Sequence, residues 1–438
     1  MSETETALDT GSTGQAVFLP KRRRLWQFLG PGLITGASDD DPSGIATYSQ
    51  VGAQFGYGMG WTMLFSFPLM AAIQEVCGRI GRVTGDGIAG NIRRYYPRWL
   101  LRTAVGLLLV ANMANLGADL GAMGDVLRLV IGFGPHLLYV ILFGLLCALL
   151  EVFMQYRRYV NVLKWTTVTL FAYFITALVV DVQWGQMLRD LVVPNISLDR
   201  NYIVSIVAVM GTTISPYLFF WQSSEEAEDQ RVDPLAHPLV EAPEQAPSEI
   251  VRIRIDTYLG MAFSNLVSLA ILVTTAATLH AHGVTDVATS AQAAEALRPI
   301  AGDFAFLVFA LGVVGTGLLA VPVLAGSAAY AVGEALEWNT GLARRPRDAR
   351  AFYGMIVFAT GIGVIINFVG FNPIKALFWA AVLNGVIAVP LMAVTMVMSM
   401  TKRVMGEFVL PKPLAVMGWL ATLVMAVIVV AMFLTWGS

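Results

Sequence analysis

The sequence predicts an all-α polytopic membrane protein with eleven transmembrane helices, two of which are broken at mid-depth. The first observation is composition, since 56% of the 438 residues are hydrophobic and 13% are charged, against about 25% charged in soluble domains. The second is a series of eleven apolar runs, each long enough for the roughly 30 Å hydrocarbon core. The third is that polar residues and a proline interrupt the first and the sixth run.

The eleven runs divide into two sets of five and a final one. We expect a first repeat at 26–183, a second at 201–400 and an eleventh helix at 413–436, with a cytoplasmic N-terminal tail at 1–25 and an extended, proline-rich cytoplasmic linker at 225–250. The expected spans are 26–54, 57–80, 103–130, 136–156, 162–183, 201–223, 253–280, 302–336, 351–370, 374–400 and 413–436.

Basic residues gather at alternate connections between the runs. They crowd the stretches 21–24, 79–98 and 344–350, whereas 132–136 and 370–373 contain no lysine or arginine. By the positive-inside rule, this pattern predicts that the N-terminus lies in the cytoplasm and the C-terminus outside. We expect the protein in the plasma (cell inner) membrane. The N-terminal tail shows neither the short apolar core nor the cleavage site of a signal peptide.

Three consecutive aspartates and a proline interrupt the first run within 39–44. An intramembrane carboxylate costs about 2.5–3.5 kcal/mol even on a lenient scale, so we expect a discontinuous helix whose freed backbone lines a polar cavity. Asp41 is the leading candidate for a cation ligand, because the following proline turns its carbonyl off the helix. Ser38 stands one turn earlier on the same face. Asp40 is expected to hydrate the mouth of the break, and Asp39 is left open between that role and a role as ligand.

The sixth run repeats this interruption with Gly211, Thr212 and the pair Ser215–Pro216. Broken helices at corresponding positions of two halves indicate an inverted repeat with a site at the membrane midplane. Thr212 and Ser215 are then candidate site residues. The alternative is that Pro216 only kinks a continuous helix. The acids at 225–229, which follow this run, are expected to form a solvated surface.

Three polar residues of the third run, Asn112, Asn115 and Asp119, share one helix face. They either line a polar pathway or hold this helix to a neighbour. Asn384 in the tenth run is a lone amide, a group that more often holds helices together than binds a ligand. Its place in the repeat nevertheless makes it a further candidate ligand.

Other classes of function find little support in the residues. The net charge of −2 gives no indication of nucleic acid binding. Cys77 and Cys147 both lie in apolar runs and suggest no disulfide framework. We find no nucleophile–base set and no His-Glu-x-x-His helix, so we do not expect an enzyme. The expected partners are a metal ion and the lipid bilayer, with no cofactor and no obligate protein partner.

The two broken runs resemble the signatures of the Nramp family of divalent metal transporters. The family's first-helix motif, Asp-Pro-Gly-Asn, stands here as Asp41-Pro42-Ser43-Gly44, and its sixth-helix motif, Met-Pro-His, as Ser215-Pro216-Tyr217. The resemblance implies a LeuT-type fold of two inverted five-helix repeats. The candidate metal site then comprises Asp41, Ser38, Gly44, Thr212, Ser215, Tyr217 and Asn384, with Asp39, Asn115 and Asp119 as possible pathway residues.

The chain departs from the family pattern at positions that bear on which metal ion is transported. Ser215 replaces a methionine whose sulfur favours transition metals, Tyr217 replaces a histidine that accompanies proton coupling, and Asn115 replaces an aspartate. Oxygen donors suit Mg²⁺ and Mn²⁺, and Gly44 leaves room for a cation that keeps several waters. The pattern resembles the Nramp-related magnesium transporter branch, which implies import by alternating access without proton coupling. The alternatives are a proton-coupled Mn²⁺/Fe²⁺ transporter, a trivalent Fe³⁺/Al³⁺ transporter, and an organic-solute transporter, against which the carboxylates argue.

Overall fold

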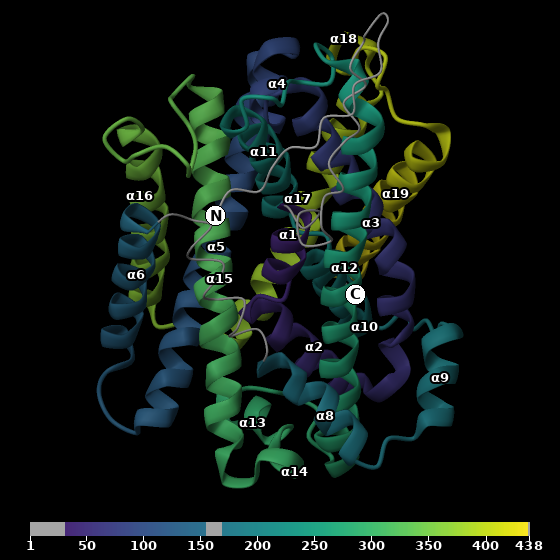
Figure 1. The fold of residues 1–438 in the computed structure, drawn as a ribbon. Helices are drawn as coiled ribbons and strands as arrows, with labels where there is room; N and C mark the ends of the chain where they lie inside the picture. Colours follow the sequence, from purple (N-terminus) through teal and green to yellow (C-terminus); the bar gives the residue numbers. More distant parts are fainter. Residues whose placement is uncertain (1–30, 155–168, 437–438) are drawn as a thin grey trace, which may run out of the picture.

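Helices make up most of the computed structural model, which describes residues 31–154 and 169–436 (Figure 1). The elements up to the middle of the chain are α1 (Pro31–Asp39), α2 (Pro42–Phe55), η2 (Gly56–Met59), α3 (Trp61–Thr84), α4 (Ile88–Tyr95), α5 (Arg98–Ile131), α6 (His136–Phe153), α8 (Phe171–Val179) and α9 (Trp184–Val192). The later ones are α10 (Arg200–Thr213), α11 (Pro216–Val232), η4 (Pro243–Gln245), α12 (Ala246–Thr278), η5 (His280–His282), α13 (Ser290–Glu295), α14 (Arg298–Ala301), η6 (Gly302–Phe304), α15 (Ala305–Ala335), α16 (Arg350–Ile366), η7 (Asn367–Val369), α17 (Pro373–Ser399), α18 (Lys402–Met405) and α19 (Lys412–Thr435).

Nine helical segments in the described ranges are long and apolar enough to cross a membrane. The first span, formed by α1 and α2, is not among them because every stretch of it long enough to cross a membrane contains all three aspartates of the break. The expected fifth span is described only as α8, since residues 155–168 lie outside the described part. The tail at 1–25 lies outside it as well. The count of eleven spans and the position of the tail therefore stay predictions.

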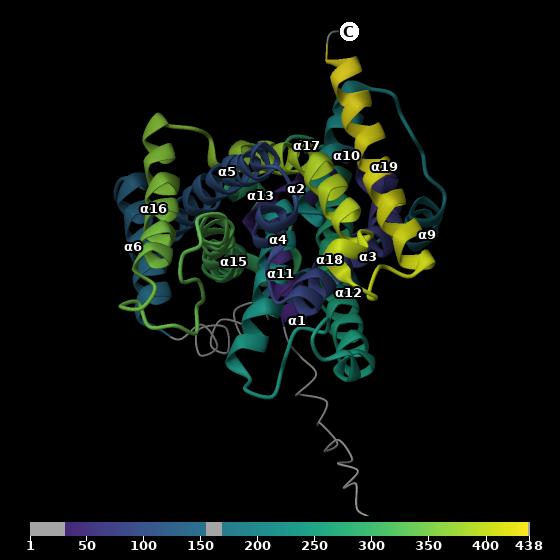
Figure 2. The same cartoon turned by 90° about the horizontal axis from the view of Figure 1, so that it is seen from above.

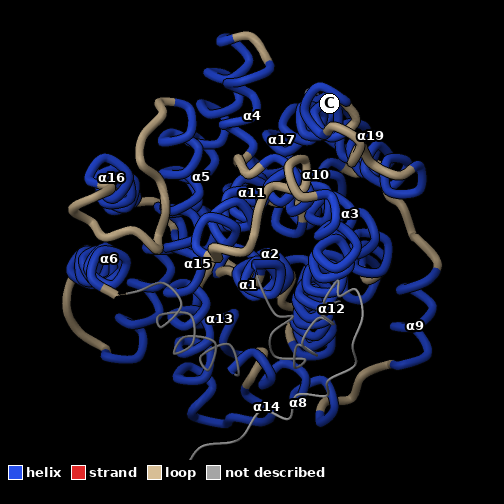
Figure 3. Tube along the Cα trace, turned by 45° about the horizontal axis from the view of Figure 1, so that its top comes forward, coloured by secondary structure: helices blue, strands red, loops and turns tan. Residues whose placement is uncertain are grey.

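Both predicted breaks are present, and both are short. α1 ends at Asp39 and α2 begins at Pro42, while α10 ends at Thr213 and α11 begins at Pro216. Each second half starts on a proline, which lacks the N–H that would go unpaired at the first helical position. The alternative of a continuous, kinked sixth helix is wrong. Figure 3 shows α1 and α2 at the centre of the molecule, next to α11, α12 and α15.

The outermost helices present apolar faces. α6 and α16 pack against each other and against α5 on one side, and α19 packs against α3 and α17 on another (Figure 2). Their outward side chains are large, apolar and exposed. They include Leu142, Leu145 and Leu149 of α6, and Leu423, Val427, Val430 and Leu434 of α19. Continuous apolar surfaces of this kind indicate contact with lipid.

The connection after the sixth span differs from the extended linker expected at 225–250. α11 continues to Val232 and α12 already begins at Ala246, so that only 233–245 join them. This connection is held to the end of α3, because the N–H groups of Leu239 and Val240 donate to the carbonyls of Arg82 and Val83, each at 3.3 Å.

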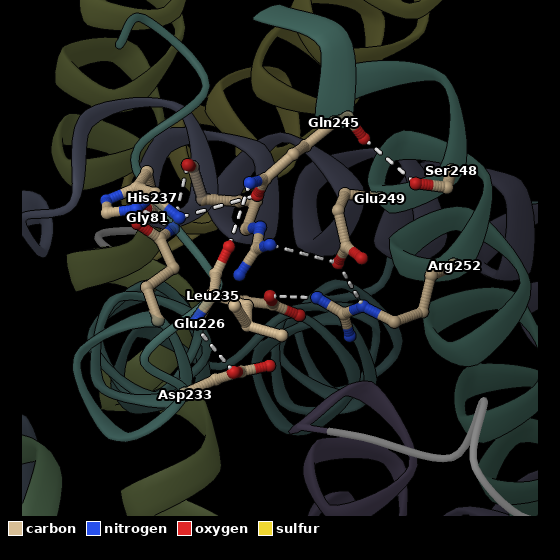
Figure 4. Close-up of polar contacts among 11 residues, drawn as sticks. Gly81, Glu226, Asp233, Leu235, His237, Gln245, Ser248, Glu249 and Arg252 are labelled. Carbon is tan, nitrogen blue, oxygen red and sulfur yellow. Dashed lines mark hydrogen bonds and ion pairs between the residues drawn. The ribbon is translucent and has the colours of Figure 1, made fainter. Parts of the chain in front are cut away.

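The acids at 225–229 are not the solvated surface that we expected. Glu226 is fully buried and pairs with Arg252, whose Nε also donates to Glu249 at 2.8 Å (Figure 4). Glu228 accepts two backbone N–H groups from the connection after α15, at 2.6 and 3.1 Å. These partners offset the cost of burying carboxylates. The helix can therefore extend through a stretch that composition alone assigns to solvent.

Candidate metal site

Asp41 lies in the first break with its side chain buried. It is the N-cap of α2, since its Oδ1 accepts from the Ser43 hydroxyl at 2.6 Å and from the Gly44 N–H at 2.8 Å. Its carbonyl accepts the Ile45 N–H at 3.1 Å. The expectation of a freed carbonyl is therefore wrong, because an N-cap residue accepts the first bond of the helix that it begins. What Asp41 offers a cation is its carboxylate.

Tyr217 joins the two breaks. Its hydroxyl donates to the Ser38 carbonyl at 2.9 Å and lies 3.4 Å from Asp41 Oδ2. The Ser38 hydroxyl, which we expected to face the site, instead donates back to the Ile34 carbonyl within α1 at 2.9 Å. Ser38 thus meets the sixth helix through its backbone oxygen, and the phenol of α11 contacts both sides of the first break.

The hydroxyls of the sixth helix lie close to the start of α2. Thr212 Oγ1 is 3.5 Å from Ser43 Oγ, and a Cβ on Gly44 would stand 3.4 Å from the same Thr212 oxygen. Ser215 Oγ lies 2.9 Å from the carbonyl oxygens of both Gly211 and Thr212, to which it donates its single proton. The Ser215 proton is thereby used, and its oxygen lone pairs are what remain for a cation.

Two amides on the polar face of α5 hold neighbouring helices. Asn112 Nδ2 donates to the Leu324 carbonyl of α15 at 2.8 Å. Asn115 Nδ2 donates to Asn384 Oδ1 of α17, also at 2.8 Å. The structure therefore brings Asn115 and Asn384 together, and the contact between them packs α5 against α17.

Several buried polar atoms in this region have no hydrogen-bond partner among the described residues. Asp119 is fully buried, neither of its carboxylate oxygens accepts a hydrogen bond from a described residue, and it lies within reach of the charge of Asp41. Asn115 Oδ1 and Asn384 Nδ2 also lack partners. Buried polar atoms in native proteins are satisfied by protein, water or ions. These atoms are therefore open to water or an ion.

Asp39 and Asp40 turn toward α12. Ser264 Oγ lies 2.7 Å from Asp39 Oδ2 and 3.1 Å from Asp40 Oδ1. Asp40 is only 2% exposed, so the prediction that it hydrates the mouth of the break is wrong, because α12 packs along α1 and covers it. Sequence reasoning missed Ser264, which stands in an otherwise ordinary helical run. It also missed Ser43, although a serine two residues after an N-cap aspartate is a recognisable capping pattern.

The donor set is mixed rather than a cluster of strong metal ligands. Within 31–154 and 169–436, no group of three or more His, Cys, Asp or Glu side chains could hold a metal ion. A cation bound at Asp41 would therefore need hydroxyl, carbonyl or water oxygens to complete its shell.

A cavity of about 700 Å³ lies between α2, α10 and α17. Its wall includes Ala46, one helical turn after Pro42, and extends past Gln50 and Gln54 to Arg200 and Lys375. The cavity therefore begins close to the first break and follows α2 away from it.

Two broken helices that meet at a buried polar centre are the arrangement of the LeuT-type fold. A manganese transporter from Eremococcus coleocola has this fold, with a TM-score of 0.70 at 18% identity over 94% of this chain and 88% of that one. MhsT in complex with L-phenylalanine has it too, with a TM-score of 0.58 at 13% identity over 92% of this chain and 98% of that one. The predicted fold class is confirmed.

The family model described as natural resistance-associated macrophage protein-like, Nramp, matches residues 32–435, and the chain therefore belongs to the Nramp family. The divalent metal cation transporter MntH of Yersinia pestis (strain Pestoides F) is 25% identical over 314 residues, 68% of this chain and 70% of that protein. The protein of the same name from Chromohalobacter salexigens is 30% identical over 306 residues, 68% of each chain. The predicted family, and a transporter rather than an enzyme, are confirmed, while the magnesium branch stays a prediction.

Proposed function

We propose that this chain imports hard divalent cations, Mg²⁺ and also Mn²⁺, by alternating access around its two broken helices. Asp41 supplies the central carboxylate, and Asp119 lies on the pathway beside it. The other proposed site residues are Ser38, through its carbonyl, Gly44, Thr212, Ser215, Tyr217 and Asn384.

The observation that carries the proposal is the oxygen character of the groups around Asp41. Its carboxylate contacts the hydroxyls of Ser43 and Tyr217, and Ser215 stands where the family signature has a methionine. Carboxylate and hydroxyl oxygens suit Mg²⁺ and Mn²⁺, whereas sulfur and imidazole suit softer metals. The unpartnered atoms of Asp119 and Asn384 favour a cation that enters with part of its water.

One buried sulfur lies near the break, on Met123 of α5. It packs against Gly317 of α15: a Cβ added to this glycine would stand 2.5 Å from the sulfur and 3.3 Å from the ring of Pro42. A thioether is a common filler of irregular gaps in a helix core. We therefore assign Met123 to packing and not to the metal site.

The names of similar proteins support a metal substrate. The two relatives from Yersinia pestis and Chromohalobacter salexigens are called divalent metal cation transporters, and the Eremococcus coleocola structure is that of a manganese transporter. A divalent metal ion is common to these names and to the present proposal, and manganese is named for the Eremococcus coleocola protein. The preference for Mg²⁺ rests on the residues of this chain and not on the names of its relatives.

Import of a divalent ion does not require protons. A divalent ion gains about 4.6 kcal/mol per 100 mV of membrane potential. Imidazole is the side chain that exchanges protons near neutral pH, and Tyr217 occupies the position of the family's histidine. We place the protein in the plasma membrane with its N-terminus in the cytoplasm. In this orientation the cavity of about 700 Å³ opens to the outside of the cell, and we propose that it is the entrance for the ion.

The test is transport by the purified full-length protein in liposomes, with protein-free liposomes as the control. We expect uptake of Mg²⁺ at millimolar concentration, increased by a negative potential inside and unaccompanied by acidification of the lumen. Strict dependence on an imposed proton gradient, or uptake of Fe²⁺ without Mg²⁺, would establish the proton-coupled Mn²⁺/Fe²⁺ transporter instead. Uptake of Fe³⁺ or Al³⁺ without Mg²⁺ would establish the trivalent alternative.

A further inference from the structure

Asp39 and Asp40 form a carboxylate pair between α1 and α12, beside Asp41 but with different partners. Both contact one hydroxyl, that of Ser264, at 2.7 Å from Asp39 Oδ2 and 3.1 Å from Asp40 Oδ1. A serine hydroxyl has a single proton to donate. It can satisfy one of the two carboxylates, and the other contact then joins two oxygens with no hydrogen between them.

The remaining polar atoms of this pair have no hydrogen-bond partner in the part of the chain that the structure describes. They are Asp39 Oδ1, Asp40 Oδ2 and the hydroxyl of Tyr48. All three side chains are at most 2% exposed. Neither carboxylate forms an ion pair with a described lysine, arginine or histidine. A buried carboxylate with no cationic partner is strongly destabilising unless it takes up a proton or binds a cation, and two adjacent carboxylates offer a cation two negative charges.

Tyr48 of α2 completes the arrangement from a third element. A Cβ on Gly44 would stand 3.3 Å from the Tyr48 ring and 3.4 Å from the Asp39 carbonyl, so the ring lies close to the break. Tyr48 lies within reach of the charges of Asp39, Asp40 and Asp41, and the Ser268 hydroxyl of α12 lies near both Tyr48 and Asp40. α12, which contributes Ser264, packs along both α1 and α2. Oxygen atoms from the break, α2 and α12 therefore gather in one buried place.

We propose that Asp39 and Asp40, with the hydroxyls of Ser264 and Tyr48, bind a second hard divalent cation. Two carboxylates balance the two charges of such an ion, as Asp41 and Asp119 balance those of the first. A monovalent cation would leave one negative charge buried. The class of ion rests on the proposed function, whereas the presence of a second site rests on the unpartnered oxygens of this pair.

The test counts bound Mn²⁺ on the purified full-length protein by equilibrium dialysis and metal analysis. We expect two ions per chain in the wild type and one in Asp40→Asn and in Ser264→Ala. Asp41→Asn should also keep one ion, which the added change Ser264→Ala removes. Ser66→Ala is the matched control, because this buried serine donates to the carbonyl of Met63 in its own helix, α3, at 3.2 Å. The control should bind two ions.

Electron paramagnetic resonance gives a readout that does not depend on transport. Two Mn²⁺ ions held by neighbouring residues broaden each other's spectrum, and the spectrum should sharpen in Asp40→Asn. Thermal unfolding shows whether each variant is folded. One ion in the wild type that Asp41→Asn removes would overturn the second site and leave the proposed function intact. One ion that survives Asp41→Asn would instead overturn the proposed role of Asp41. Release of the second ion by Na⁺ would overturn its assignment as divalent.

Discussion

Buried acids occur in two regions of this molecule, and they differ in their partners. One region is the Arg252 cluster, where Arg252 contacts Glu226 and Glu249, and Arg82 reaches Glu249 at 3.4 Å (Figure 4). The other region holds the central acids, which form no ion pair with any residue that the structure describes. The central acids are Asp39, Asp40, Asp41 and Asp119.

This difference indicates that the charges of the Arg252 cluster stabilise the fold, whereas those of the central acids serve to bind a ligand. Removing one member of a buried ion pair costs about 3–5 kcal/mol, because the other charge is left alone. The central acids are already buried without a charged partner among the described residues. We infer that the Arg252 cluster stabilises α3, α11 and α12 against one another, whereas the central acids gain their counter-charge from the transported ion.

The largest expected effect tests the central acids. Asp41→Asn keeps a side chain that caps α2 and removes the charge. Uptake of Mg²⁺ and Mn²⁺ should fall to the level of protein-free liposomes, while the Tm without divalent ions stays the same or rises. Added Mg²⁺ should raise the Tm of the variant less than that of the wild type, because a ligand stabilises the folded protein less when its affinity is lower. Asp303→Asn, at an exposed acid, is the control. Normal uptake by Asp41→Asn would contradict the inference that the central acids bind the transported ion.

The second prediction concerns the Arg252 cluster. Arg252→Ala leaves Glu226 buried without its partner and should lower the free energy of unfolding by about 3–5 kcal/mol. Chemical or thermal unfolding of the purified protein measures the change. The matched control is Arg298→Ala, which breaks an exposed pair with Glu295 and should cost at most about 1 kcal/mol. Equal losses in the two variants would mean that the Arg252 cluster is no more than a surface network.

The two regions also differ in how far they could be predicted. The breaks follow from local patterns, since Asp41 directly precedes Pro42 and Ser215 directly precedes Pro216. The partners of Asp39 and Asp40 do not, because Ser264 stands 225 and 224 residues away in the chain. Glu226 was misassigned for a related reason. Acids are rarely buried unless paired, and the pairing arginine lies on another helix whose packing no local pattern specifies.

The smallest expected effect changes the chemistry of the centre without changing its charge. Ser215→Met replaces a hydroxyl by a thioether at the position where the family signature has methionine. Because soft ligands select softer metals, the variant should bind Cd²⁺ about tenfold more tightly, which corresponds to about 1.4 kcal/mol, while the stability of the Arg252 cluster is unaffected. Competition of Cd²⁺ with Mn²⁺ uptake measures the affinity, with Met123→Leu as a control that should leave it unchanged. If Met123→Leu alters Cd²⁺ affinity and Ser215→Met does not, the sulfur of α5, and not the sixth break, faces the ion.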